Sequence, residues 1–98
     1  MTIQRTGNEK KLAIALEGRL DTMTAPELEA ALDGALEGVE ELTFDFEKLD
    51  YISSAGLRVL LSTQKTMNRQ GVMKVLHANE MIREIFDVTG FSDILTIE

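Results

Sequence analysis

Apolar and polar positions alternate with a period of two near the start of the chain, as in a half-buried strand. Residues 11–18 alternate strongly apolar side chains with small or polar ones, and residues 3–5 form a shorter stretch before them. The polar, glycine-containing residues 7–10 between them are typical of a turn. The sequence therefore predicts two strands joined by a turn, with residues 18–22 leaving the second strand.

The following segment repeats its apolar residues at the spacing of a helix. Thr24 is placed to begin this helix, because Pro26 suits the first turn and Glu27 completes a capping box with Thr24. Gly38 is placed to end it after about three turns. The expected apolar stripe consists of Leu28, Ala31, Leu32, Ala35 and Leu36.

Two further amphipathic helices are predicted, one over residues 54–69 and one that Asn79 caps and Gly90 ends. The first of them carries a separate polar stripe. The expected inward positions are Leu57, Leu60, Leu61 and Met67 in the first helix and Met81, Ile82, Ile85 and Phe86 in the second. The polar stripe consists of Arg58, Ser62, Lys65 and Arg69.

Three short apolar stretches complete the predicted sheet, at residues 42–46, 72–76 and 94–97. The order strand, helix and strand around residues 54–69 indicates a βαβ unit, whose two strands are parallel. We therefore expect a single α/β domain over residues 1–98. It should contain a mixed sheet of four or five strands, with the helices mainly on one face.

The composition is that of a soluble globular domain, with 44% hydrophobic and 28% charged residues. The absence of cysteine excludes a disulfide framework, a thiolate metal site and a thiol nucleophile. Neither a signal peptide nor an apolar run of membrane-spanning length is visible, so a cytoplasmic location is expected. The net charge of −7 argues against binding nucleic acid or an acidic membrane over the whole surface.

The charge is divided unevenly along the chain. Residues 17–50 contain eleven acidic and two basic residues, whereas residues 51–79 contain four basic residues and no acidic one. Such blocks are typical of solvated helix faces, or they form a polarised surface that steers a charged protein partner. Both interpretations stay open from the sequence.

Few residues suggest catalysis. The only histidine, His77, follows a predicted strand without a partner at metal-ligand spacing, which favours a loop or cap position. No glycine-rich phosphate loop is present, and the acidic residues lie mostly on predicted outer helix faces. We therefore expect a protein that is not an enzyme and that needs no metal or cofactor.

The stretch Ser53-Ser54-Ala55-Gly56 opens the central helix with two hydroxyl groups and two small residues. A serine here is a helix cap, part of an anion site, or the acceptor of a phosphoryl group. The helix dipole would tolerate a phosphate at this end, so phosphorylation should leave the fold intact and act on a docked partner. Asp45, expected near the end of the preceding strand, would bind loop amides there or support this turn.

Three motifs, in this order and spacing, resemble the STAS domain family and in particular the anti-sigma factor antagonists (anti-anti-sigma factors) of bacteria. The resemblance covers essentially the whole chain. The motifs are Gly18-Arg19-Leu20-Asp21, Leu42-Thr43-Phe44-Asp45-Phe46 leading to Tyr51-Ile52-Ser53-Ser54-Ala55-Gly56-Leu57, and Val88-Thr89-Gly90-Phe91.

The resemblance implies a partner switch in the regulation of transcription, as in stress responses. In that family, the unphosphorylated protein binds an anti-sigma factor that is a serine kinase, which releases a sigma factor. The kinase then phosphorylates a serine at this turn and breaks the complex, and a PP2C-type phosphatase restores it. The family's acceptor lies two residues before the motif glycine, which is Ser54 here, and the loop aspartate falls on Asp21.

Ser53 stands where family members often have aspartate, which makes it a second candidate acceptor. Relatives that are never phosphorylated, such as accessory subunits of lipid transporters, give an alternative function. A small enzyme is the alternative from another class, and it would need a deep pocket rather than a flat docking surface around Ser54. The expected partner-binding residues are Asp21, Thr22, Ser53, Ser54, Gly56, Arg58, Ser62 and Lys65, with Asp45 in support.

Overall fold

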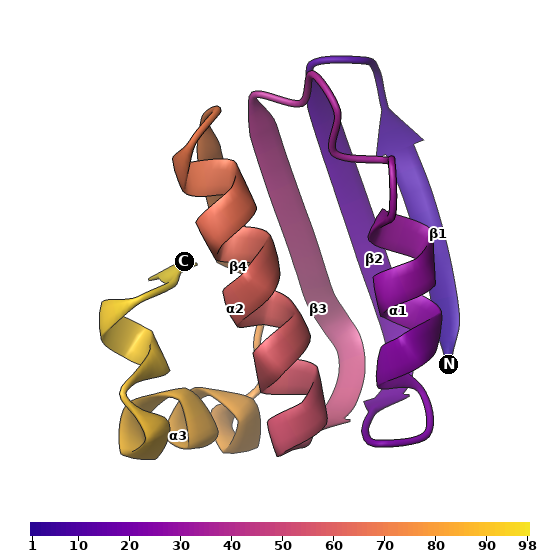
Figure 1. Cartoon of the computed structure of the whole chain (residues 1–98). Helices are drawn as coiled ribbons and strands as arrows, with labels where there is room; N and C mark the ends of the chain where they lie inside the picture. The colour runs from indigo at the N-terminus through magenta and orange to yellow at the C-terminus, as the bar shows by residue number, and fades with distance from the viewer.

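A computed structural model describes residues 1–98, and it contains the predicted mixed sheet with three α-helices (Figure 1). The five strands lie in the order β1-β2-β3-β4-β5, with β1 antiparallel to β2 and every other neighbouring pair parallel. The strands are β1 (Thr2–Gly7), β2 (Lys11–Leu20), β3 (Glu41–Ile52), β4 (Val72–Leu76) and β5 (Thr96–Ile97). The helices are α1 (Ala25–Leu32), α2 (Ser54–Asn68) and α3 (Glu80–Thr89), followed by a short 3-10 helix (Phe91–Asp93).

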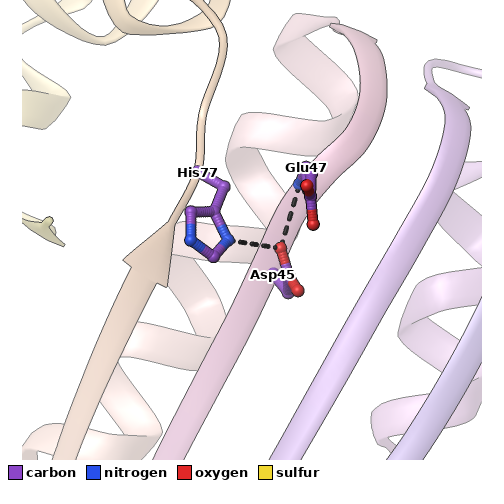
Figure 2. A group of neighbouring side chains, drawn as sticks. All are labelled: Asp45, Glu47 and His77. Carbon is purple, nitrogen blue, oxygen red and sulfur yellow. Dashed lines mark hydrogen bonds and ion pairs between the residues drawn. The ribbon is translucent and has the colours of Figure 1, made fainter.

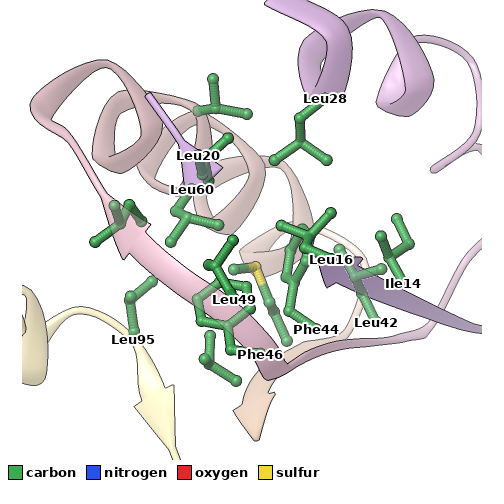
Figure 3. Packing of buried hydrophobic residues seen from close by; sticks show 14 of the residues in the cluster. Ile14, Leu16, Leu20, Leu28, Leu42, Phe44, Phe46, Leu49, Leu60 and Leu95 are labelled. Atoms are coloured by element: carbon green, nitrogen blue, oxygen red, sulfur yellow. The ribbon is translucent and has the colours of Figure 1, made fainter. Parts of the chain in front are cut away.

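Helices α1 and α2 cover the same face of the sheet, as the sequence predicts (Figure 1). One cluster of 23 buried apolar residues fills the space between the two layers. Strand residues such as Ile14, Phe44 and Phe46 meet helix residues such as Leu28 and Leu60 there (Figure 3). Helix α3 adds Ile82 and Phe86 to this core, whereas Met81, expected to face inward, is 54% exposed. None of the helices has the length and apolar character needed to cross a membrane.

The two central strands are longer than their apolar patterns predict. Strand β2 does not end at Gly18, because it continues to pair with β3 as far as Leu20 and Ile52. Register shifts between Ala15 and Glu17 and between Gly18 and Arg19 interrupt the alternation without ending the ladder. A β-bulge inserts an extra residue in this way and strengthens the local twist. Despite the bulges, β2 and β3 stay paired and end at the same edge of the sheet.

Helix α1 is shorter than predicted and is capped differently. It ends at Leu32 rather than near Gly38, and Asp33 after it already has an extended conformation. The Thr24 side chain makes no capping hydrogen bond to the helix, so the predicted capping box is wrong. Its hydroxyl instead accepts from the Asp21 amide at 2.8 Å and donates to the Arg19 carbonyl at 2.7 Å. Thr24 thus fixes the loop between β2 and α1.

Gly56, in the first turn of α2, allows this helix to approach the ends of β2 and β3. A Cβ atom at this position would lie 2.7 Å from Leu20 Cγ and 2.9 Å from Ile52 Cγ1. Both side chains are fully buried, so neither can move into solvent. Only glycine fits between the helix and the two strand ends.

We predict that Gly56→Ala destabilises the domain by about 1–3 kcal/mol through overpacking. The sign is diagnostic, since alanine normally stabilises a helix interior by about 0.5–1 kcal/mol relative to glycine. Urea unfolding of the purified variant measures the change. The double variant Leu20→Val/Gly56→Ala should lose less stability than the two single changes predict together, because the smaller side chain leaves room. Additive losses would mean that Leu20 is not the obstructing group.

Candidate functional site at the start of helix α2

Two loops meet at the end of the sheet where β2 and β3 finish. The Ser53 amide donates a hydrogen bond to the Leu20 carbonyl at 2.9 Å. Ser53 therefore follows β3 directly beside the point where Asp21 follows β2. Because both strands are parallel, their carboxyl ends share one edge of the sheet, which is where α/β sheets commonly bind ligands or partners. The sequence motifs at Asp21 and at Ser53-Ser54 thus form one surface.

The two serines of the turn have different environments. Ser53 is the residue that caps α2, with an extended backbone and a half-buried side chain whose Oγ accepts from the Gly56 amide at 3.4 Å. Ser54 is the first residue of the helix, is exposed, and forms no side-chain hydrogen bond. The cap and the free hydroxyl, which the sequence left as alternatives for one site, therefore belong to separate residues.

Asp21 holds the neighbouring loop with its carboxylate. Oδ1 accepts from the amides of Met23 at 2.9 Å and of Thr24 at 3.1 Å. These bonds, that to Thr24 first, lower the pKa of Asp21 below its usual value, and Arg19 contributes to the same effect. Asp21 thus stays ionised and gives the loop a fixed shape beside the serine turn. Thr22, in the same loop, is exposed.

Met23 is a residue of this surface that the sequence analysis missed. Its side chain is 82% exposed, the largest value among the exposed large apolar residues. The Asp21 carboxylate fixes the Met23 amide, so the side chain is presented from an ordered loop. A methionine outside every helical or strand stripe, between Asp21 and Thr24, was the only signal available in the sequence.

The outer stripe of α2 extends the surface away from the turn. Arg58, Ser62 and Lys65 are exposed, in agreement with the prediction, and neither Arg58 nor Lys65 forms a salt bridge. A hollow of about 680 Å³ separates this helix from α1. It is lined by Ser62 on the α2 side and by the acidic Glu29, Asp33 and Glu37 on the other. The α1 side of the hollow is therefore acidic, whereas the α2 side contributes uncharged polar residues such as Ser62.

Two predicted site residues are not part of this exposed surface. Gly56 is buried against Leu20 and Ile52, so it shapes the turn and is not available to a partner. Asp45 lies in the middle of β3 rather than near its end, because the strand continues to Ile52. Its hydrogen bonds go to His77 and to the Glu47 amide, so the expected support of the serine turn is wrong.

Asp45 and His77 form a separate polar pair. His77 Nδ1 lies 2.9 Å from Asp45 Oδ1, and the same oxygen accepts from the Glu47 amide at 3.0 Å (Figure 2). The hydrogen bond to His77 lowers the pKa of Asp45, with the Glu47 amide adding to it. The same bond to Asp45 raises the pKa of His77. His77 is thus the loop histidine that the sequence favours, although it has carboxylate neighbours that spacing did not reveal.

Comparison with known proteins agrees with the motifs. The family model of the STAS domain matches residues 2–98. The chain is 35% identical over 88 residues to BtrV of Bordetella bronchiseptica, whose name assigns it to the anti-sigma factor antagonists; the match covers 88% of this chain and 76% of that protein. It is 27% identical over 99 residues to the anti-sigma-B factor antagonist of Staphylococcus aureus, covering 99% of this chain and 92% of that protein.

The fold is similar to that of SpoIIAA, an anti-sigma factor antagonist. The TM-score is 0.78 to its unphosphorylated form, at 19% identity, covering 99% of this chain and 87% of that one. The TM-score to the phosphorylated form from Bacillus is 0.77, at 20% identity, and the match covers 99% of this chain and 91% of that one. At these identities the likeness concerns the fold alone. Because the family model matches the chain from residue 2 to residue 98, the chain belongs to the STAS domain family.

Proposed function

We propose that this protein is an anti-sigma factor antagonist that acts in the cytoplasm and is controlled by phosphorylation of Ser54. In the unphosphorylated form it binds an anti-sigma factor that is a serine kinase, and so releases a sigma factor. A PP2C-type phosphatase reverses the modification. The names of BtrV and of the Staphylococcus aureus relative support this class of function. The observation that carries the proposal is the exposed, unbonded hydroxyl of Ser54 at the start of α2.

Ser54 suits the role of acceptor better than Ser53 does. A phosphoryl group on Ser54 breaks no hydrogen bond of the fold and lies where the helix dipole favours negative charge. A phosphoryl group on Ser53 would displace the hydroxyl that caps the Gly56 amide from a half-buried position. Ser53 thus keeps the helix start in shape, and Ser54 is free to be modified.

The added charge would act on the docked partner rather than on the fold. Phosphorylation adds about −1.5 to −2 charges at neutral pH. The ionised Asp21 lies in the adjoining loop, so the modified turn becomes strongly acidic and bulky. Charge repulsion and steric exclusion would both weaken a closely fitting complex. We assign the contact surface to Asp21, Thr22, Met23, Ser54, Arg58, Ser62 and Lys65, with Ser53 at its edge.

We predict that a cognate anti-sigma serine kinase with ATP adds one phosphate to the chain, on Ser54, as mass spectrometry of the peptides will locate. Ser54→Ala should abolish the modification. Ser53→Ala should keep it, although loss of the cap should cost about 0.5–2 kcal/mol of stability. Phosphate on Ser53 would reverse the assignment. A chain that stays unmodified by its cognate kinase would instead favour a STAS subunit without a switch.

Ser54→Asp should weaken kinase binding at least tenfold and leave the thermal unfolding midpoint nearly unchanged. The reason is that a carboxylate at the first turn of a helix is stabilised by the dipole, by about 0.3–1 kcal/mol. Calorimetric titration and thermal unfolding measure the two effects, and Ser54→Ala is the matched variant that should still bind. If Ser54→Asp unfolds the domain, Ser54 has a structural role and the switch loses its basis.

Met23→Ala should cost more than about 1 kcal/mol of binding free energy to the same kinase, since a partner that covers this exposed side chain would bury most of its apolar surface. Its unfolding midpoint should stay constant because Met23 contributes almost nothing to the core. Val72→Ala is the matched control, as Val72 is half-exposed and pairs with Glu41 at the opposite end of β3. Equal effects of both changes on binding would exclude Met23 as an anchor.

A further inference from the structure

Three potential metal ligands lie together on the face of the sheet that the helices leave uncovered. Asp45 and Glu47 are two residues apart on β3, so the alternation of the strand directs both toward this face. His77 follows directly after β4, whose last residue pairs with Asp45. One ligand atom from each of the three side chains lies within 4.8 Å of the others. Figure 2 shows the imidazole of His77 turned toward the two acidic residues.

The backbone of His77 has an unusual conformation beside the cluster. His77 has φ +62°, the only positive value at a residue other than glycine. Non-glycine residues adopt this conformation rarely, and here the chain leaves the sheet while the imidazole remains beside Asp45. The ligand atoms therefore come from two segments about thirty residues apart, held together by the β3–β4 pairing.

A hollow adjoins the cluster and extends its set of oxygen atoms. It has a volume of about 230 Å³ and is lined by Asp45, Glu47 and the further carboxylate of Glu17, with Gln4 and Thr2 from β1. Lys48 also lines it, and its positive charge is outnumbered by the three carboxylates. Liquid water occupies about 30 Å³ per molecule, so the hollow has room for an ion and several waters. The register shift that pairs Ala15 with Asp45 but Glu17 with Lys48 lies beside this hollow.

We propose that Asp45, Glu47 and His77 bind a divalent transition-metal ion of the zinc class on the open face of the sheet. One imidazole and two carboxylates suit Zn²⁺ and its first-row neighbours, whereas Mg²⁺ and Ca²⁺ prefer oxygen ligands alone. The ion displaces the proton that lies between His77 Nδ1 and Asp45 Oδ1; this proton goes to water, Nε2 carries the remaining hydrogen of the imidazole, and Glu47 supplies the third ligand. Water from the adjoining hollow completes the coordination.

A simple ion pair accounts for the cluster less fully. Asp45 and His77 alone would form an exposed pair, a kind of contact that contributes little to stability. An Asp45–His77 ion pair does not explain why the Glu47 carboxylate also lies within 4.8 Å of the imidazole. A bound ion uses all three groups and links β3 to the segment that precedes α3. It lies apart from Ser54, so metal binding and partner binding are separate properties.

The test is a calorimetric titration of the full chain with Zn²⁺ at neutral pH. We expect a single site with one ion per chain. His77→Ala should abolish it, and Glu47→Gln should weaken it by at least about tenfold. Glu29→Gln, on α1 across the sheet, is the matched control and should bind as the parent chain does. The chain has one histidine and no cysteine, so no second imidazole and no thiolate can account for the binding.

The imidazole supplies a second, independent readout. In nitrogen-15 NMR of the single histidine, Zn²⁺ should give Nδ1, the nitrogen that faces Asp45, the resonance of a metal-bound nitrogen and Nε2 that of a protonated one. Mg²⁺ at the same concentration should shift neither. Three results would each overturn the site. They are Zn²⁺ binding that persists in His77→Ala, equal affinity in Glu47→Gln and the parent chain, and a shift confined to Nε2. The absence of any response to Zn²⁺ at millimolar concentration would overturn it as well.

Discussion

The pairing of β2 with β3 as far as Leu20 and Ile52 is the constraint on which the rest of the structure depends. It brings the Ser53 amide to the Leu20 carbonyl, and it leaves room for α2 only because Gly56 has no side chain. The Asp21 loop and the serine turn are therefore neighbours through the backbone, not through a contact between their own side chains. The backbone pairing therefore sets how close the two segments lie, and the side chains of Asp21 and Ser53 then fix their local shape.

The residues that hold the surface in place differ from those whose side chains are free. The Asp21 carboxylate and the Ser53 hydroxyl are both occupied by backbone amides, so they hold the loop and the helix start in place. Ser54 and Met23 project from the same two segments without hydrogen-bonded side chains. A charge added at such a position would alter the exposed surface without breaking a hydrogen bond of the fold. A rigid turn with a free hydroxyl is well suited to a reversible switch.

Much of this was predictable from the sequence, because it depends on local patterns. Alternating residues located the strands, the helical spacing located α2 and α3, and Asn79 and Gly90 marked the ends of α3. The errors have non-local causes. Bulged pairing with β3 continues β2 beyond Gly18, and the Thr24 hydroxyl binds the Asp21 amide instead of forming the expected capping box. Which serine caps α2 depends on the residue at which β3 ends. The sequence, with two neighbouring serines, does not reveal that residue.

Asp45 illustrates how one error of length changes an assignment. The sequence placed Asp45 at the end of a short strand, where its carboxylate would lie near the serine turn. In the structure Asp45 lies in the middle of a twelve-residue strand, and its carboxylate contacts His77. Successive residues of β3 face opposite sides of the sheet, so Phe44 and Phe46 build the core while Asp45 and Glu47 line the open face. The same strand thus leads into the serine turn at its end and carries the acidic cluster along its side. Because the core lies between α2 and that cluster, a ligand on the open face can change stability without touching Ser54.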